Sequence, residues 1–477
     1  MTTRDDFNLT AQTLDRYLDE IEERRQPVLT QAPMSELADR LQIRELVREG
    51  GLHGDRLQAF LGDYLDNAVH IQHPANMGHQ VACPHPSGVI GGLIDAFTNN
   101  PMAIYEMGPA AATIEYVLLN WMLEKIGWTP APVPGGEVMV AGTGAFGAGV
   151  LTHGGSLAQL TALAAARAEA DKTAWEAGNS SDLVVIASGE AHYSVSRALG
   201  ILGLGQKALI PAECDREGRI IPDRLGQTID AAQDEGRVIM AVAANAGCTA
   251  AGLYDDLEAI GQICRERGLW LHVDGAHGAS ALLSGKYRPL LKGVEQASSL
   301  IWDAHKMMRS PGLCAAVLFR DHRHLDHAFA QEASYLFHDK DQAGFDAISR
   351  TVECTKAGLG LRLFMGLAAE GEQAMGAYVE GRYDLAAAAA DLIEARPEFE
   401  LAVRPEANIV CFRLKGGSDQ RHLELRKALL AGGESYITTT ALAGRRWLRM
   451  TFMNPLTTLD DVRHALDQLV KLAELRQ

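Results

Sequence analysis

The sequence has few cysteines, no paired cysteine motif and no long apolar run. Its seven cysteines are scattered, with no CxxC pair and no Cys/His spacing suited to zinc. This pattern excludes a disulfide-built fold, and we expect reduced thiols in a cytoplasm. No stretch approaches the roughly 20 apolar residues that span a bilayer, and the acid-rich N-terminus is not typical of a secretory or transit peptide. We therefore expect a soluble cytoplasmic protein that does not contact membranes.

Basic residues are outnumbered by acidic ones. There are 44 Lys and Arg against 61 Asp and Glu, which gives a formal net charge of −17. That charge repels nucleic-acid phosphates, so nucleic-acid binding is excluded as a function class. With 47% hydrophobic and 22% charged residues, the 477-residue chain has an ordinary globular composition. Its length predicts two packed domains, or one large domain with extensions.

The order of segments predicts an α/β protein in three parts. An amphipathic helical arm is expected over residues 1–70, before a stretch rich in Pro, Gly and His. Over 71–360, runs such as DLVVIAS, VIMAVAA, LWLHVD and SLIWDAH alternate with helical segments, as does EVMVAG near the start. This alternation predicts a large domain with a mostly parallel central sheet and helices on both faces. Residues 361–477 are expected to add long helices and a small C-terminal α/β domain.

Two polar residues follow neighbouring predicted strands. Strand LWLHVD ends in Asp274, and strand SLIWDAH leads into Lys306. In open α/β sheets ligands bind beyond the carboxyl ends of strands, so both side chains are expected to face one crevice. A lone lysine there is usually solvated, but His305 and Lys306 stand between an apolar strand and MMRSPG, which favours a buried ligand. An aspartate such as Asp274 can hold a proton on a pyridinium nitrogen, and the small residues that follow it leave space for a flat ring. The alternative role of Asp274 is to cap a helix.

A second segment predicts an anion site. GVLTHGGSLAQLTALAAAR places Gly155 and Ser156 at the start of a long helix, where backbone N–H groups converge on a phosphate. The nearby GTGAFG, from Gly142 to Gly147, matches a dinucleotide-binding pattern and raises the alternative of an NAD oxidoreductase. The acid expected about twenty residues later would fall within a helix, which weakens that alternative. His192, in SGEAHYSVSRA, follows another strand, where an imidazole can stack on an aromatic cofactor.

Together these motifs resemble those of the group II pyridoxal 5′-phosphate (PLP) decarboxylases, closest to the glutamate, cysteine-sulfinate and aspartate branch. HVDGAHG resembles HVDAAWGG, WDAHKMM resembles WNPHKMM, and SGEAHYSVSRA resembles SEHSHFS, in the same order along the chain. The resemblance covers about residues 70–455 and implies PLP fold type I, the aspartate-aminotransferase-like fold. It also implies a homodimer with the active site at the interface.

The resemblance implies a role for each site residue. Lys306 would hold PLP as a Schiff base and act with His192 in catalysis. The residues implied to bind PLP are Lys306, Asp274, Ala276, His192, Gly155, Ser156, His305 and Asn245. Those implied to contact substrate are Arg449, His79 and Phe345. Arg449 favours an acidic substrate, although aromatic decarboxylases also carry an arginine in the corresponding strand.

Four departures from the family pattern bear on the reaction. Asp303 and Ala304 replace Asn-Pro before His-Lys, His277 replaces a tryptophan, and Asn245 replaces a threonine near the ring. In the loop after the lysine, Phe345 stands where relatives carry a tyrosine that is thought to protonate the substrate carbon. Tyr335 or His338 could supply the proton instead; without any donor, oxygen could react and yield an aldehyde.

The expected reaction is α-decarboxylation of an acidic L-amino acid, such as glutamate, aspartate or cysteine sulfinate, to the amine and CO2. The alternatives are an aromatic or diamino substrate, or a decarboxylation-coupled aldehyde synthase. From other classes, a PLP aminotransferase or oxidase would share the lysine and aspartate, and a non-catalytic binding protein would tolerate loss of Lys306. No metal is expected.

Overall fold

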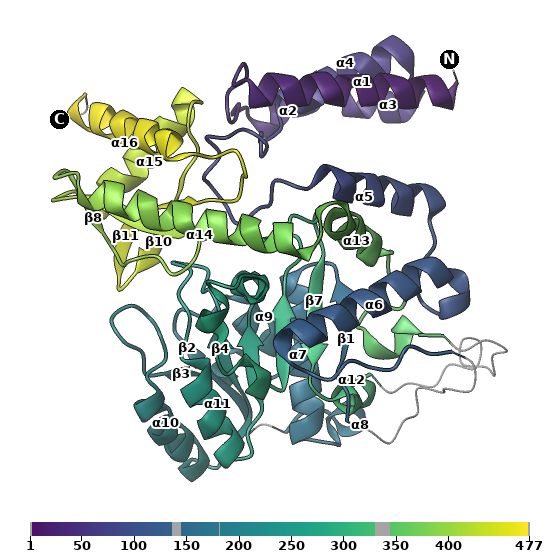
Figure 1. Ribbon diagram of the computed structural model, residues 1–477, viewed down its shortest axis with the longest axis vertical. Coiled ribbons are helices and arrows are strands. Elements are labelled where there is room, and N and C mark those ends of the chain that lie inside the picture. Colours follow the sequence, from purple (N-terminus) through teal and green to yellow (C-terminus); the bar gives the residue numbers. More distant parts are fainter. Residues whose placement is uncertain (1, 136–144, 181, 330–343, 476–477) are drawn as a thin grey trace. The chain divides into compact units, whose positions relative to one another are not determined.

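The computed structural model describes residues 2–135, 145–180, 182–329 and 344–475 (Figure 1). Contacts divide the chain into two compact units. Unit 1 holds Met1–Cys83, Leu385–Arg404 and Ile409–Gln477, and unit 2 holds Pro84–Asp384 and Pro405–Asn408. No helix within the described residues is long and apolar enough to cross a membrane.

Unit 2 is built on a seven-stranded sheet with the order β1-β7-β6-β5-β4-β2-β3. Its strands are β1 (Ala148–Thr152), β2 (Leu183–Ser188), β3 (Leu209–Ala212), β4 (Val238–Asn245), β5 (Leu271–Asp274), β6 (Ser299–Trp302) and β7 (Ala315–Phe319). Strand β7 is antiparallel to both of its neighbours, and the other pairs are parallel. Every residue of β1, β2, β6 and β7 is buried, so both faces of the sheet are covered. The predicted α/β fold with a mostly parallel sheet is confirmed.

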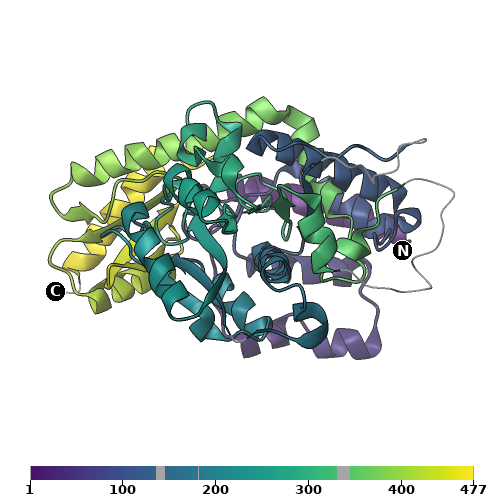
Figure 2. The ribbon, with the colours of Figure 1, turned by 90° about the horizontal axis from the view of Figure 1, so that it is seen from below.

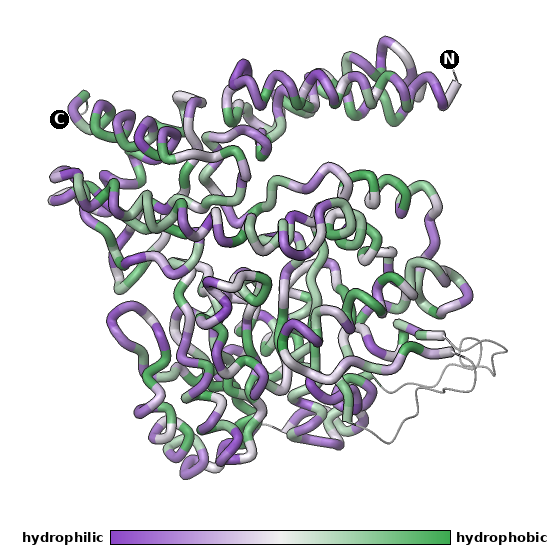
Figure 3. The backbone as a smooth tube through the Cα atoms, viewed as in Figure 1, coloured by the Kyte–Doolittle hydropathy of each residue, from purple (hydrophilic) through white to green (hydrophobic). Residues whose placement is uncertain are grey.

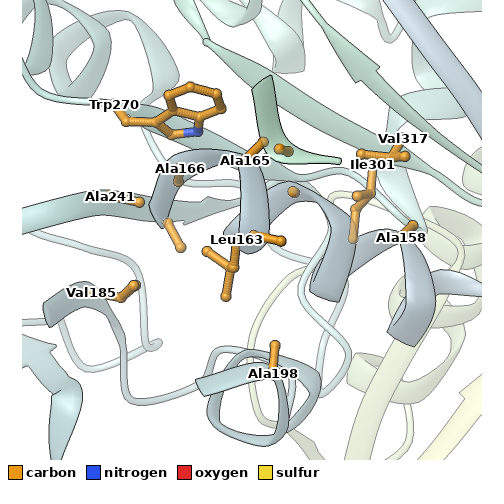
Figure 4. Packing of buried hydrophobic residues seen from close by; sticks show 14 of the residues in the cluster. Ala158, Leu163, Ala165, Ala166, Val185, Ala198, Ala241, Trp270, Ile301 and Val317 are labelled. Atoms are coloured by element: carbon orange, nitrogen blue, oxygen red, sulfur yellow. The ribbon is translucent and has the colours of Figure 1, made fainter. Parts of the chain in front are cut away.

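Most of the α-helices in the described part of the chain belong to unit 2. They are α5 (Pro86–Thr98), α6 (Pro109–Ile126), α7 (Gly155–Ala170), α8 (Ala174–Ala177), α9 (Ser194–Ile201), α10 (Pro222–Asp234), α11 (Leu257–Glu266), α12 (His322–Ala328), α13 (Leu359–Glu370) and the first part of α14 (Glu372–Glu394). Helix α7 is rich in alanine, which brings its backbone close to the sheet. Ala158, Ala165 and Ala166 pack in the same buried cluster as Val185 and Val317 (Figure 4). This packing fixes the start of α7 beside the ends of the central strands.

Unit 1 joins both ends of the chain. It contains α1 (Thr3–Glu22), α2 (Met34–Arg40), α3 (Ile43–Glu49), α4 (Gly54–Asp66), β8 (Phe399–Leu401), β9 (Ile409–Leu414), α15 (Asp419–Gly432), β10 (Thr438–Leu442), β11 (Arg445–Thr451) and α16 (Leu459–Glu474). The four strands form an antiparallel sheet in the order β10-β11-β9-β8. Ala389 and Ile393, near the end of α14, pack with Phe412 of that sheet. Figure 2 shows the light-green to yellow ribbons of the C-terminal residues grouped together.

The contact division differs from the three-part division predicted from the sequence, which stays a prediction. Residues 71–83 group with the C-terminal strands, since the Met77 N–H donates to the Tyr436 carbonyl at 2.9 Å. Helix α13 groups with the large sheet, because it packs against α5 and α6. The expected strand EVMVAG, residues 137–142, lies outside the described residues, and β1 overlaps the start of the segment predicted to bind phosphate.

Candidate active site

A cavity of about 270 Å³ lies at the carboxyl ends of the parallel strands of unit 2. All eight residues predicted to bind PLP line it: Gly155, Ser156, His192, Asn245, Asp274, Ala276, His305 and Lys306. The register explains the convergence, because Asn245 pairs with Asp274 at the ends of β4 and β5, and Asp274 pairs with Ile301 of β6. Side chains that are far apart in sequence therefore meet at one edge of the sheet.

Lys306 enters the cavity from the turn after β6. Its Nζ lies 2.9 Å from Oδ2 of Asp303, and its side chain is 20% exposed. His305 beside it is anchored, because its Nδ1 lies 2.8 Å from the Cys314 carbonyl oxygen. That contact directs Nε2 towards Asp303, at 3.7 Å. The lysine amine is thus held at the wall of the cavity by a nearby carboxylate.

The first turn of α7 forms the end of the cavity that is suited to an anion. Gly154 has a φ of +102°, a conformation that favours glycine, and it turns the chain into the helix. No side chain caps this end of α7, and the first N–H groups of any helix have no partner within it. These groups and the positive end of the helix dipole attract a phosphate. Gly155 is needed for close approach, since a Cβ there would lie 2.8 Å from Asp303 Oδ2.

Asp274 and His192 form the part of the cavity suited to a heteroaromatic ring. Burial raises the pKa of Asp274, and the charges of Lys306 and His192 oppose that rise. The carboxylate also accepts a hydrogen bond from the Ala276 N–H at 3.2 Å. Burial lowers the pKa of His192, which favours a neutral imidazole, and its Nδ1 lies 2.8 Å from Ser194 Oγ. An enclosed carboxylate of this kind is stabilised when a cation such as a pyridinium lies beside it.

Asp255 supports this arrangement, and sequence reasoning missed it. Its carboxylate accepts the Asn245 N–H at 2.6 Å and the Ile220 N–H at 2.8 Å, which fixes the end of β4. Burial raises the pKa of Asp255 to about 6. The cavity also contains residues that were not predicted to bind: His153, Gly154, Ser194, Gly247, Cys248, Thr249, His277, Ile301, Asp303 and Leu313. Adjacency to the predicted motifs was the only sequence signal for most of them.

His277, which replaces the family's tryptophan, lies in the cavity wall. It is 2% exposed, and its Nε2 lies 2.6 Å from Oδ1 of Asn408. The Asn408 amide in turn lies 3.2 Å from the Met307 sulfur. The cavity wall therefore carries the hydrogen-bonded imidazole of His277 at the position where relatives carry an indole. This part of the wall is more polar as a result.

The predicted substrate residues do not line this cavity within the described chain. Arg449 and His79 belong to unit 1, where Arg449 is 5% exposed. Phe345 belongs to unit 2 but packs on Tyr116, with ring centroids 5.1 Å apart, beside a different pocket. Tyr335 and His338, the two alternative proton donors, lie outside the described residues. The roles of all five stay predictions.

Comparison with known proteins decides the family. The conserved domain of pyridoxal-dependent decarboxylases matches residues 53–415. The chain belongs to the pyridoxal-dependent decarboxylase family. This decarboxylase is similar to L-2,4-diaminobutyrate decarboxylase of Acinetobacter baumannii, with 28% identity over 88% of this chain and 83% of the relative. It is 29% identical to cysteine sulfinic acid decarboxylase of Rattus norvegicus, over 85% of this chain and 83% of the relative.

The crystal structure of mouse CSAD is similar to this decarboxylase over 99% of both chains, with 26% identity and a TM-score of 0.86. The predicted family, fold type I and PLP cofactor are therefore confirmed, and the decarboxylase is a PLP-dependent carboxy-lyase. The NAD alternative raised by GTGAFG is wrong, and residues 142–144 of that motif lie outside the described chain.

The cavity fits PLP on its own geometry. An amine, a carboxylate and an uncapped helix N-terminus line a single space, which matches the aldehyde, ring nitrogen and phosphate of the cofactor. Lys306 would hold the cofactor covalently, and Asp274 would face the ring nitrogen. His192 and Ala276 would enclose the ring, and the start of α7 would hold the phosphate.

Proposed function

We propose that this decarboxylase removes the α-carboxylate of an acidic L-amino acid, such as glutamate, aspartate or cysteine sulfinate. The α-carboxylate leaves as CO2, a proton takes its place on the same carbon, and the amine is released. Similarity to a cysteine sulfinic acid decarboxylase supports an acidic substrate. Similarity to a diaminobutyrate decarboxylase supports the chief alternative.

The observation that carries the proposal is the buried guanidinium of Arg449 on β11. Burial lowers the pKa of His79, and the positive charges of Arg449 and Arg426 lower it further. The two guanidinium groups of unit 1 therefore lie close enough to the His79 imidazole to interact with it, and they supply positive charge beside a ring that is itself neutral. A planar guanidinium donates two parallel hydrogen bonds to a carboxylate or sulfinate, which matches the side chain of an acidic amino acid.

The residues of the cavity would divide the chemistry among them. When bound, PLP accepts the electron pair left behind by the departing carboxylate. Lys306 would release the cofactor to the substrate amine, and Asp274 would keep a proton on the ring nitrogen. His192 and Ala276 would hold the ring flat and exclude water from its faces. Fixed charges of this kind contribute most when they are in place before the reaction.

We expect Arg449→Gln to lower kcat/KM for the acidic substrate about 100-fold, the loss expected for one charge-assisted bidentate contact. The assay compares glutamate, aspartate, cysteine sulfinate, 2,4-diaminobutyrate and aromatic amino acids, and reads CO2, amine, aldehyde, ammonia and hydrogen peroxide. Arg445→Gln is the matched control, because Arg445 is an exposed arginine of the same strand. Turnover of only a diamino or aromatic acid would contradict the proposal, and aldehyde with peroxide would instead indicate an aldehyde synthase.

We also propose that the decarboxylase is a homodimer with its active site at the interface. Helix α5 supports this, since it is apolar over most of its length (Figure 3). It also exposes the side chains of Val89, Ile90, Leu93, Ile94 and Phe97. Contiguous apolar surface of this kind is typical of protein interfaces.

The expected mass in sedimentation equilibrium is that of two chains. Replacing both Ile90 and Phe97 with Asp is expected to give single chains, because it buries charge in an apolar contact. Ile201→Asp is the control at a similarly exposed position, 63% exposed on α9. A wild type that sediments as one chain would refute the dimer, and a double variant that stays dimeric would exclude α5 from the interface.

A further inference from the structure

Asp303 is the carboxylate nearest to the cofactor's anchor. It is 1% exposed, and its Oδ2 lies 2.9 Å from Nζ of Lys306. Its other oxygen, Oδ1, is buried and has no hydrogen-bond partner among the described residues. A buried acceptor without a partner is costly, so this carboxylate is poised to change its contacts or its charge.

Asp303 also lies at the anion-binding end of the cavity. Its carboxylate lies beside Gly155, since a Cβ at that position would lie 2.8 and 2.9 Å from the two carboxylate oxygens. The first turn of α7, which is suited to a phosphate, therefore already has a negative group against it. Like charges held this close in a buried site are not stable together unless one of them takes up a proton.

The other groups facing Asp303 do not cancel this conflict. His305 Nε2 lies 3.7 Å away, and His192 and Asp274 interact with Asp303 through their charges. Lys306 is the closest cation, but its amine must lose its positive charge before it can attack the cofactor aldehyde. The ion pair that stabilises Asp303 in the empty cavity is thus interrupted while the amine attacks the aldehyde.

We propose that Asp303 couples PLP binding to the uptake of one proton. As the phosphate docks at α7, Asp303 Oδ2 accepts the proton of the Lys306 ammonium. The lone pair freed on Lys306 Nζ forms a bond to the aldehyde carbon of PLP. The aldehyde oxygen leaves as water with the two protons that remain on the amine, and solvent then gives one proton to the nitrogen. The net change is the uptake of one proton from solvent, and Asp303 holds the additional proton. This inference depends on the cofactor of the family and not on the identity of the substrate.

The test is calorimetric titration of the apoenzyme with PLP, for wild type and Asp303→Asn, in buffers of different ionisation enthalpy. Because the proton is taken up only when Asp303 is present, we expect the wild type to bind one proton more than the variant. Where the wild type takes up this proton, its Kd for PLP should rise about tenfold more per pH unit than the Kd of the variant. The phosphate of PLP titrates equally in both proteins, so the difference isolates Asp303. Asp223→Asn, on the exposed first turn of α10, is the control and should behave as wild type.

Inorganic phosphate gives a second readout that needs neither Lys306 chemistry nor turnover. We expect Asp303→Asn to bind phosphate more tightly than the wild type, as measured by competition with PLP. Equal proton uptake and equal pH slopes in the two proteins would overturn the proposal, as would weaker binding of both PLP and phosphate by a variant whose melting temperature is unchanged. A decarboxylase with an unexpected substrate would leave these results unaffected.

Discussion

Replacement of Lys306 by Ala is expected to abolish the visible absorption band of lysine-bound PLP and to lower kcat at least about a thousandfold. Lys306 is the lysine of the cavity, and no other lysine lines it in the described chain. Its loss removes both the covalent anchor and the amine that exchanges with substrate. Non-covalent PLP binding should persist, because the start of α7 and Asp274 are unchanged.

The control for this variant is Lys172→Ala, which removes an exposed lysine paired with Glu169. It should retain the wild-type spectrum and turnover. Wild-type turnover by Lys306→Ala would mean that another group carries the cofactor or that the reaction proceeds elsewhere. If the variant lost turnover but kept the visible band of lysine-bound PLP, a different lysine would hold the cofactor. That result would contradict the assignment of both attachment and catalysis to Lys306.

Lys356→Met is expected to destabilise unit 2 by about 3–5 kcal/mol, the cost of leaving a buried charge without its partner. The side chains of Lys356 and Glu115 are both fully buried, with Nζ 2.6 and 2.5 Å from the two carboxylate oxygens. Glu115 also accepts the Leu151 N–H of β1 at 3.0 Å. The pair therefore ties α6 and the segment before α13 to the edge of the large sheet.

Urea denaturation of the single variants and of Glu115→Gln/Lys356→Met measures this effect. Because the double variant leaves no unpaired charge, it should lose less free energy of unfolding than Lys356→Met alone. Lys292→Met is the control, since Lys292 pairs with Glu258 at 2.8 Å with both side chains largely exposed, and such pairs contribute about 0–1 kcal/mol. A loss from Lys356→Met no larger than that of the control would show that the buried pair is not stabilising the unit.

The cofactor cavity could be predicted because its residues follow strands. Asp274, His192 and Lys306 each stand just after an apolar run, and parallel strands bring their carboxyl ends to one edge. The start of α7 was predictable for a similar reason, since glycines before a helix leave N–H groups for a phosphate. Local signals of this kind do not depend on knowing the tertiary contacts.

Other features depend on contacts that no local pattern reveals. Asp255 looks like an ordinary turn residue, and only the fold shows that it holds Asn245 and Ile220 together. The grouping of residues 71–83 with the C-terminal strands arises from pairing across more than 350 residues, as between Asn76 and Tyr436. The proximity of Asp303 to Gly155 likewise brings together a turn and a helix start that are far apart in the sequence.

The most direct test of the central claim is to reduce the PLP-loaded decarboxylase with borohydride, digest it and locate the pyridoxyl group by mass spectrometry. We expect the group on the peptide that contains Lys306, in stoichiometric amount, and its absence after the same treatment of Lys306→Ala. A pyridoxyl group on a different lysine, or no covalent label in a protein that retains turnover, would contradict the assignment of Lys306 as the cofactor's anchor.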